Sequence, residues 1–168
     1  MSITELGAVG ELLSSIVVLA TLIYLAAQVR QTKLTVQSSS WQGGIQSIMD
    51  INALLATDSD LLDIFLRGMA NPDALDSTEQ VRMSFVLANL FHTYHKWYRD
   101  HQKGLVDEEA RRGEELSMLA MLSQPGGERW WRNFGIPYTP KFRSYVDSRL
   151  DKTNRSEASR FDWRDPLS

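Results

Sequence analysis

The strongest pattern in the chain is an uncharged apolar segment near its start. From Leu12 to Ala27 it reads LLSSIVVLATLIYLAA, and its apolar character extends outward to Gly7 and Val29. As a helix, the shorter segment would be about 24 Å long and the longer one about 34 Å, against a hydrocarbon core of about 30 Å. Uncharged runs of this length are uncommon in soluble cores, so the pattern predicts a transmembrane helix rather than a buried soluble one.

After this segment, hydrophobic side chains recur every three to four positions, which is the spacing of amphipathic helices. No window alternates as a strand would, so we expect an all-α protein. It would comprise an N-terminal transmembrane helix with its flanks (residues 1–33), a small helical-bundle domain (34–152) and a flexible C-terminal tail (153–168). The expected boundaries are a break at Gly43-Gly44, a cap within Thr57-Asp58-Ser59-Asp60, caps at Ser77 and Thr139, a stop at Gly104, and a turn at Pro125-Gly126-Gly127 that ends a helix.

The charges that flank the apolar segment predict that it is not a cleaved signal peptide, and they predict its orientation in the membrane. Met1 to Gly10 contain no Lys or Arg, whereas a secretory signal peptide needs basic residues before its apolar core. Arg30 and Lys33 follow the segment, and no acidic residue occurs after them until Asp50. The excess of positive charge predicts that the C-terminal domain lies in the cytoplasm and the N-terminus outside.

Small and polar residues form a stripe within the predicted span. Gly7, Ser14, Thr21 and Gln28 recur at intervals of seven, with Glu11 one turn from the first two. Such residues let helices in lipid approach closely and hydrogen-bond to one another, so the stripe favours self-association. Chance placement of common residues is the alternative. In a second hypothesis, four or more copies form a pore lined by the stripe, with Glu11 as an acidic ring.

Composition excludes several classes of function. Acidic residues outnumber basic ones by 21 to 18, so no net positive field favours nucleic acid. The chain has no cysteine, which removes disulfides, CxxC redox chemistry and thiolate metal sites. We found no nucleophile elbow, phosphate loop or dinucleotide fingerprint, and we expect no cofactor, no metal and no enzymatic activity.

Two groups of side chains remain as candidates for chemistry or binding. His92 and His95, in the sequence HTYH, lie one helical turn apart, but the spacing matches no established zinc motif and predicts packing rather than metal binding. The Trp130-Trp131 pair favours core packing, and contact with a partner protein is the alternative.

Several blocks of the sequence resemble a family of uncharacterised bacterial proteins that have one N-terminal membrane helix and a helical cytoplasmic domain. These blocks are LIYLAAQVRQ, LRG, YRDHQKGLVDEE, SQPGGERWW and PKFRSYVD. The likeness extends from about Leu12 to Asp147. The resemblance implies the same topology and a bacterial inner-membrane location, and it implies no activity.

Together these features predict a non-enzymatic, membrane-anchored helical protein. Its expected partners are the lipid bilayer and either further copies of itself or a larger membrane complex, in which it would act as a scaffold, accessory or regulatory protein. The homo-oligomeric pore is the alternative. An enzyme acting through His92 and His95 is a third and weaker hypothesis.

Overall fold

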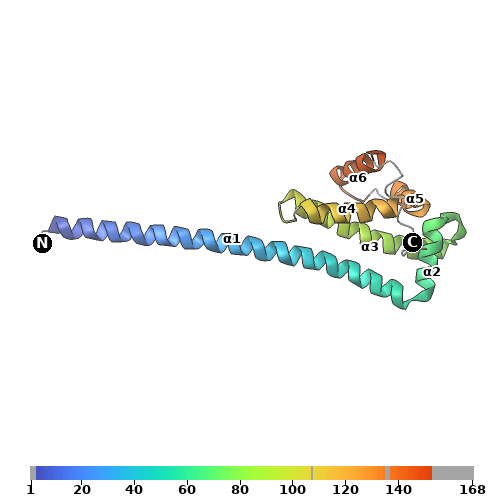
Figure 1. The fold of residues 1–168 in the computed structure, drawn as a ribbon, viewed down its shortest axis with the longest axis horizontal. Coiled ribbons are helices and arrows are strands. Elements are labelled where there is room, and N and C mark those ends of the chain that lie inside the picture. Colours follow the sequence, from blue (N-terminus) through green and yellow to red (C-terminus); the bar gives the residue numbers. More distant parts are fainter. Residues whose placement is uncertain (1–2, 107, 135–136, 153–168) are drawn as a thin grey trace. The chain divides into compact units, whose positions relative to one another are not determined.

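The protein is all-α in a computed structural model that describes residues 3–106, 108–134 and 137–152. This confirms the predicted fold class. The elements are α1 (Ile3–Thr57), α2 (Ser59–Ala70), the short 3-10 helix η1 (Pro72–Ala74), α3 (Ser77–Gln102), α4 (Glu108–Leu122), α5 (Pro125–Phe134) and α6 (Pro140–Lys152) (Figure 1).

Contacts divide the chain into two units that meet between Ser39 and Ser40. The first unit contains only the start of α1, which we call its first half. The second unit, the helical domain, begins with the second half of α1 (Ser40–Thr57) and includes all later helices. The predicted boundary between 33 and 34 marks where the chain is expected to leave the membrane, which contacts within the chain do not test, so it stays a prediction. The predicted tail, 153–168, lies outside the described residues.

The helical domain is organised around α3. This helix packs against α2 and α4, while α5 contacts α2, α3 and α4, and α6 packs on α4 (Figure 1). Leu87 and Phe91 of α3 are completely buried, as is Val146 of α6. Burial of such side chains stabilises the fold by about 1.5–3 kcal/mol each.

The predicted cap before α2 and the predicted stop at Gly104 are confirmed, whereas the predicted cap of α3 is off by one residue. The Asp58 side chain accepts a hydrogen bond from the Leu61 N–H and caps α2. Gly104, after the end of α3, has a left-handed φ of 67°, which glycine adopts without strain. The capping box of α3 uses Asp76 and Glu79, one residue earlier than predicted, because the Asp76 carboxylate accepts bonds from the N–H groups of Thr78 and Glu79.

The glycines of the PGG sequence were predicted to form a turn, and this was wrong. Pro125 is the first residue of α5, and both glycines lie within its first turn. A Cβ on Gly126 would stand 2.1 Å from the carbonyl oxygen of Gly68 in α2, and one on Gly127 would stand 2.1 Å from that of Met121. The glycines therefore allow close approach of three helix backbones rather than a chain reversal.

The predicted break at Gly43-Gly44 was also wrong, because α1 continues without interruption to Thr57. Gly44 is buried against the indole ring of Trp97, and a Cβ at this position would stand 2.1 Å from Trp97 Nε1. Gly43 is exposed, and a Cβ there would meet no atom within 4 Å. Gly44 therefore serves helix packing, and neither glycine ends the helix.

Candidate functional site

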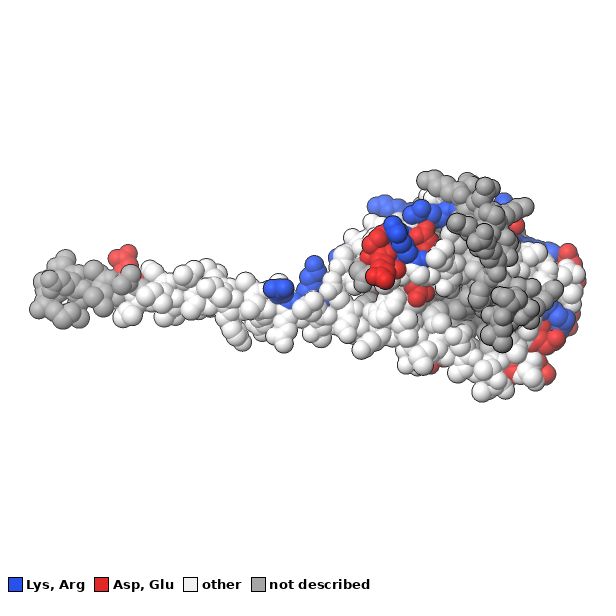
Figure 2. Space-filling model, viewed as in Figure 1, with Lys and Arg blue, Asp and Glu red and all other residues white. Residues whose placement is uncertain are grey.

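The first half of α1 is long and apolar enough to cross a membrane, and none of its most hydrophobic window is buried. Ten large hydrophobic side chains between Leu13 and Val29 are each 47–69% exposed. No Lys, Arg, Asp or Glu occurs from Leu12 to Val29, and Figure 2 shows a stretch of α1 without acidic or basic side chains. This part of the helix therefore offers an apolar surface that the described chain leaves uncovered.

The predicted stripe lies entirely on the exposed surface of this helix. Gly7, Glu11, Ser14, Thr21 and Gln28 are all exposed, and a Cβ on Gly7 would meet no atom within 4 Å. The stripe is thus accessible to another helix. Its contact with a second copy, like the lining of a pore, stays a prediction.

The hydroxyl groups of the stripe are satisfied within their own helix. Ser14 Oγ donates to the Gly10 carbonyl oxygen over 2.8 Å, and Thr21 Oγ1 donates to the Val17 carbonyl oxygen over the same distance. Because each donor is used locally, both side chains can enter a hydrocarbon environment without a partner helix. A bond from a second helix would use a free lone pair of the hydroxyl oxygen, which limits the gain per hydroxyl to about 1 kcal/mol.

The two tryptophans that were candidates for partner contact lie in the core of the helical domain. Trp130 is 6% exposed and Trp131 2%, and their ring centroids lie 5.1 and 5.3 Å from that of Phe91. Trp131 Nε1 donates to Asp147 Oδ1 over 2.8 Å, which joins α5 to α6. Core packing therefore accounts for the pair better than an interface does.

The two candidate histidines of α3 face different surroundings. The His95 ring stacks on Phe142 with centroids 4.7 Å apart, and its Nε2 lies 3.2 Å from Thr139 Oγ1. Burial lowers the pKa of His95, and the positive charge of Arg99 adds to the effect. His92 is exposed, and no group of three metal-ligating side chains occurs among the described residues.

A polar cluster that joins α1 to α3 was not predicted from the sequence. Lys96 Nζ donates to Ser40 Oγ over 2.7 Å and to Asp100 Oδ2 over 2.9 Å, and Ser40 Oγ also donates to Asp100 Oδ2. Burial alone would raise the pKa of Asp100, but the bonds from Ser40 and Lys96 outweigh burial and hold the pKa below its usual value.

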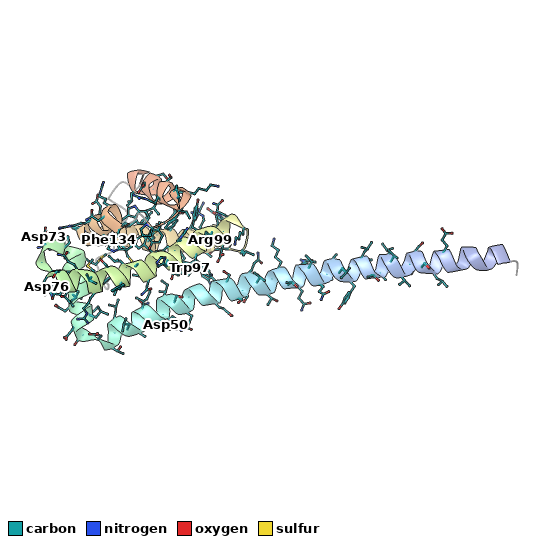
Figure 3. The ribbon with its side chains drawn as sticks, turned by 180° about the vertical axis from the view of Figure 1, so that it is seen from behind. Asp50, Asp73, Asp76, Trp97, Arg99 and Phe134 are labelled. Atoms are coloured by element: carbon teal, nitrogen blue, oxygen red, sulfur yellow. The ribbon has the colours of Figure 1, made fainter. Side chains whose placement is uncertain are left out.

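The polar cluster is continued by an aromatic contact at the start of the helical domain. Trp97 of α3, labelled in Figure 3, stacks on Trp41 with ring centroids 5.4 Å apart and lies directly against Gly44. Its indole N–H is buried without a hydrogen-bond partner among the described residues. The cluster and this stack together fix the beginning of the second half of α1 to the end of α3.

Comparison with known proteins adds nothing to these observations, because no family profile, curated protein or solved structure matches the chain. The resemblance to the bacterial family of single-span proteins stays a prediction. Within its blocks, Gly68 and Gly126 lie where helix backbones approach closely, Asp100 belongs to the polar cluster, and Gly104 has a left-handed φ.

Proposed function

We propose that the protein is a non-enzymatic membrane anchor with a helical domain, which self-associates or docks onto a larger membrane complex. In this proposal the first half of α1 crosses a bacterial inner membrane. The domain lies in the cytoplasm, because Arg30 and Lys33 follow the span. The role is that of a scaffold or an accessory subunit.

The observation that supports the anchor best is the complete exposure of the apolar window in α1. If each of the ten large hydrophobic side chains leaves roughly 100 Å² of apolar surface exposed, the total is about 1,000 Å². The largest apolar patch of a typical soluble monomer is about 300–600 Å². Transfer of this area into hydrocarbon would contribute about 25 kcal/mol, far more than marginal association with a membrane surface requires.

Self-association through the stripe is tested by disulfide crosslinking, for which the absence of native cysteine is ideal. Thr21→Cys places a thiol on the stripe. Leu19→Cys and Ile23→Cys place one on the opposite face, since two residues correspond to about 200° around a helix. All three positions are exposed on α1, so the controls match in accessibility.

In native membranes under mild oxidation, Thr21→Cys should form crosslinked dimers while the two controls remain monomeric. Equal crosslinking at the three positions would indicate random collision and would exclude the stripe as an interface. Absence of crosslinks at every position from Gly7 to Gln28 would exclude self-association through the span and would leave docking onto another membrane protein.

The orientation is tested with Gln102→Cys, an exposed position at the end of α3. A membrane-impermeant maleimide should label this thiol only after the cells are permeabilised. Labelling of intact cells would place the helical domain outside and refute the predicted topology.

A further inference from the structure

The second half of α1 has an exposed face that lacks charge. Its residues follow one another at intervals of four and three, as in a coiled-coil seam, and every one of them is exposed: Gln42, Gln46, Met49, Ala53 and Ala56. We call them the outer face. Met49, at its centre, is 57% exposed, although a methionine side chain is apolar.

The lack of charge distinguishes this face from the rest of the helical domain. Asp50 is the only charged residue between Lys33 and Asp58. It lies beside the outer face, where its Oδ1 accepts a hydrogen bond from Gln46 Nε2 over 2.7 Å, and it lines the groove towards α3. Helices α2 to α6 all contain both acidic and basic residues. In Figure 2 most acidic and basic side chains lie over the later helices, and few lie along α1. A fully hydrated helix face would ordinarily include charged side chains, so this face has the composition of a contact surface.

We infer that the outer face binds the same face of a second copy of the chain, in parallel orientation. Two copies related by a two-fold axis along the pair place each residue near its own counterpart, so a charged side chain at the contact would face a like charge. The outer face is free of that conflict. This inference rests on the proposed self-association of the span.

The repeat along α1 supports a second copy rather than an unrelated partner. Counting back in sevens from Met49 gives Gln42, Thr35, Gln28, Thr21, Ser14 and Gly7. The outer face thus continues the seven-residue repeat of the stripe in the sequence. A straight helix drifts by about 20° per heptad, so a pair that uses both surfaces would supercoil to the left. Copies inserted in one membrane share their orientation, and pairing through the span raises the effective concentration of the two outer faces to the millimolar range.

The contact is tested in the full-length protein in native membranes by comparing Met49→Cys with Ser47→Cys. Both positions are exposed, and they lie about 200° apart on α1. Ser47 instead lines a groove of about 470 Å³ between α1 and α3. We expect the crosslinked fraction at Met49→Cys to exceed that at Ser47→Cys by at least about fivefold.

Introducing a charge at position 49 tests the same contact without a thiol on the outer face. In the Thr21→Cys background, Met49→Glu should lower the crosslinked fraction roughly threefold through like-charge repulsion, while Ser47→Glu should leave it unchanged. Coexpression of Met49→Glu with Met49→Lys should restore crosslinking, since opposite charges then face each other. A variant that had merely misfolded would not be rescued in this way.

The outcomes separate this inference from the proposed function. If Thr21→Cys crosslinks and Met49→Cys does no better than Ser47→Cys, the outer-face contact is refuted while association of the span stands. If Met49→Cys crosslinks and Thr21→Cys does not, the outer-face contact stands and association through the span is refuted. A different membrane protein on this face would leave Met49→Cys uncrosslinked between copies, which also refutes the inference.

Discussion

Gly44 offers the sharpest test of how the second half of α1 is fixed to α3. An alanine methyl group at this position would lie 2.1 Å from Trp97 Nε1 and 2.4 Å from Trp97 Cε2. Ordinary van der Waals contact begins at 3.4 Å, so the ring or the helix must move by about 1.3 Å, the difference between 3.4 and 2.1 Å. Trp97 is 3% exposed and stacked on Trp41, so it has little room to move.

The magnitude follows from two opposing effects. Forcing an extra methyl group into a packed core costs about 1–3 kcal/mol, whereas replacing glycine with alanine inside a helix contributes about 1 kcal/mol of stability. The adjacent Gly43→Ala substitution should show only the stabilisation from higher helix propensity, because a Cβ there meets no atom within 4 Å. The difference between the two variants isolates the packing cost and should be about 1–3 kcal/mol.

The assay is thermal unfolding of the full-length protein in detergent, followed by far-UV circular dichroism and tryptophan fluorescence. Each kcal/mol corresponds to a shift of about 2–4 °C in a protein of this size, so Gly44→Ala should unfold at least about 2 °C below Gly43→Ala. Equal midpoints, or a higher midpoint for Gly44→Ala, would refute the argument that Gly44 is required for close approach to Trp97.

Three further substitutions test the packing and electrostatics of the helical domain by the same unfolding measurement. Gly126→Ala should destabilise the domain by about 1–3 kcal/mol, since its Cβ would meet a backbone oxygen, whereas Gly113→Ala, with no atom within 4 Å, should be neutral or stabilising; equal effects would contradict this. Asp100→Asn should cost about 1–3 kcal/mol at neutral pH. Because hydrogen bonding holds the pKa of Asp100 below 3.8, this stability is present above that pH and is lost as the pH falls through the lowered pKa, so a deficit independent of pH would be evidence against the ion pair. Glu114→Gln should stabilise the domain at neutral pH, because burial raises the pKa of this carboxyl above 4.5 and the folded state prefers its neutral form; the gain should shrink as the pH falls and the carboxyl of the parent protein takes up its proton.

Local patterns in the sequence predicted the helices well, because local interactions determine where helices begin and end. The cap predicted within Thr57-Asp58-Ser59-Asp60, which the structure assigns to Asp58, and the stop at Gly104 each depend on residues within one turn of the chain. The apolar segment of α1 was equally visible, since a long uncharged run needs no tertiary partner to be recognised. The sequence also revealed the stripe, and the structure shows in addition that its residues are exposed.

The errors arose where one residue type has two uses. Glycine can end a helix or allow another chain to approach, and the choice at Gly44 depends on Trp97, which lies far away in the sequence. The same applies to Gly126, whose neighbour is the backbone of Gly68. The contact between Ser40 and Asp100 joins residues 60 positions apart, and no local motif marks it. Such contacts follow from tertiary packing and need the folded structure.

Membrane fractionation decides whether the first half of α1 lies in a lipid bilayer. Membranes from cells expressing the full-length protein are washed with alkaline carbonate, which removes peripheral proteins but not spanning helices. We expect the protein to stay in the membrane pellet and to enter solution only with detergent. Recovery of monodisperse protein from the aqueous wash without detergent would show that the first half of α1 does not span a membrane.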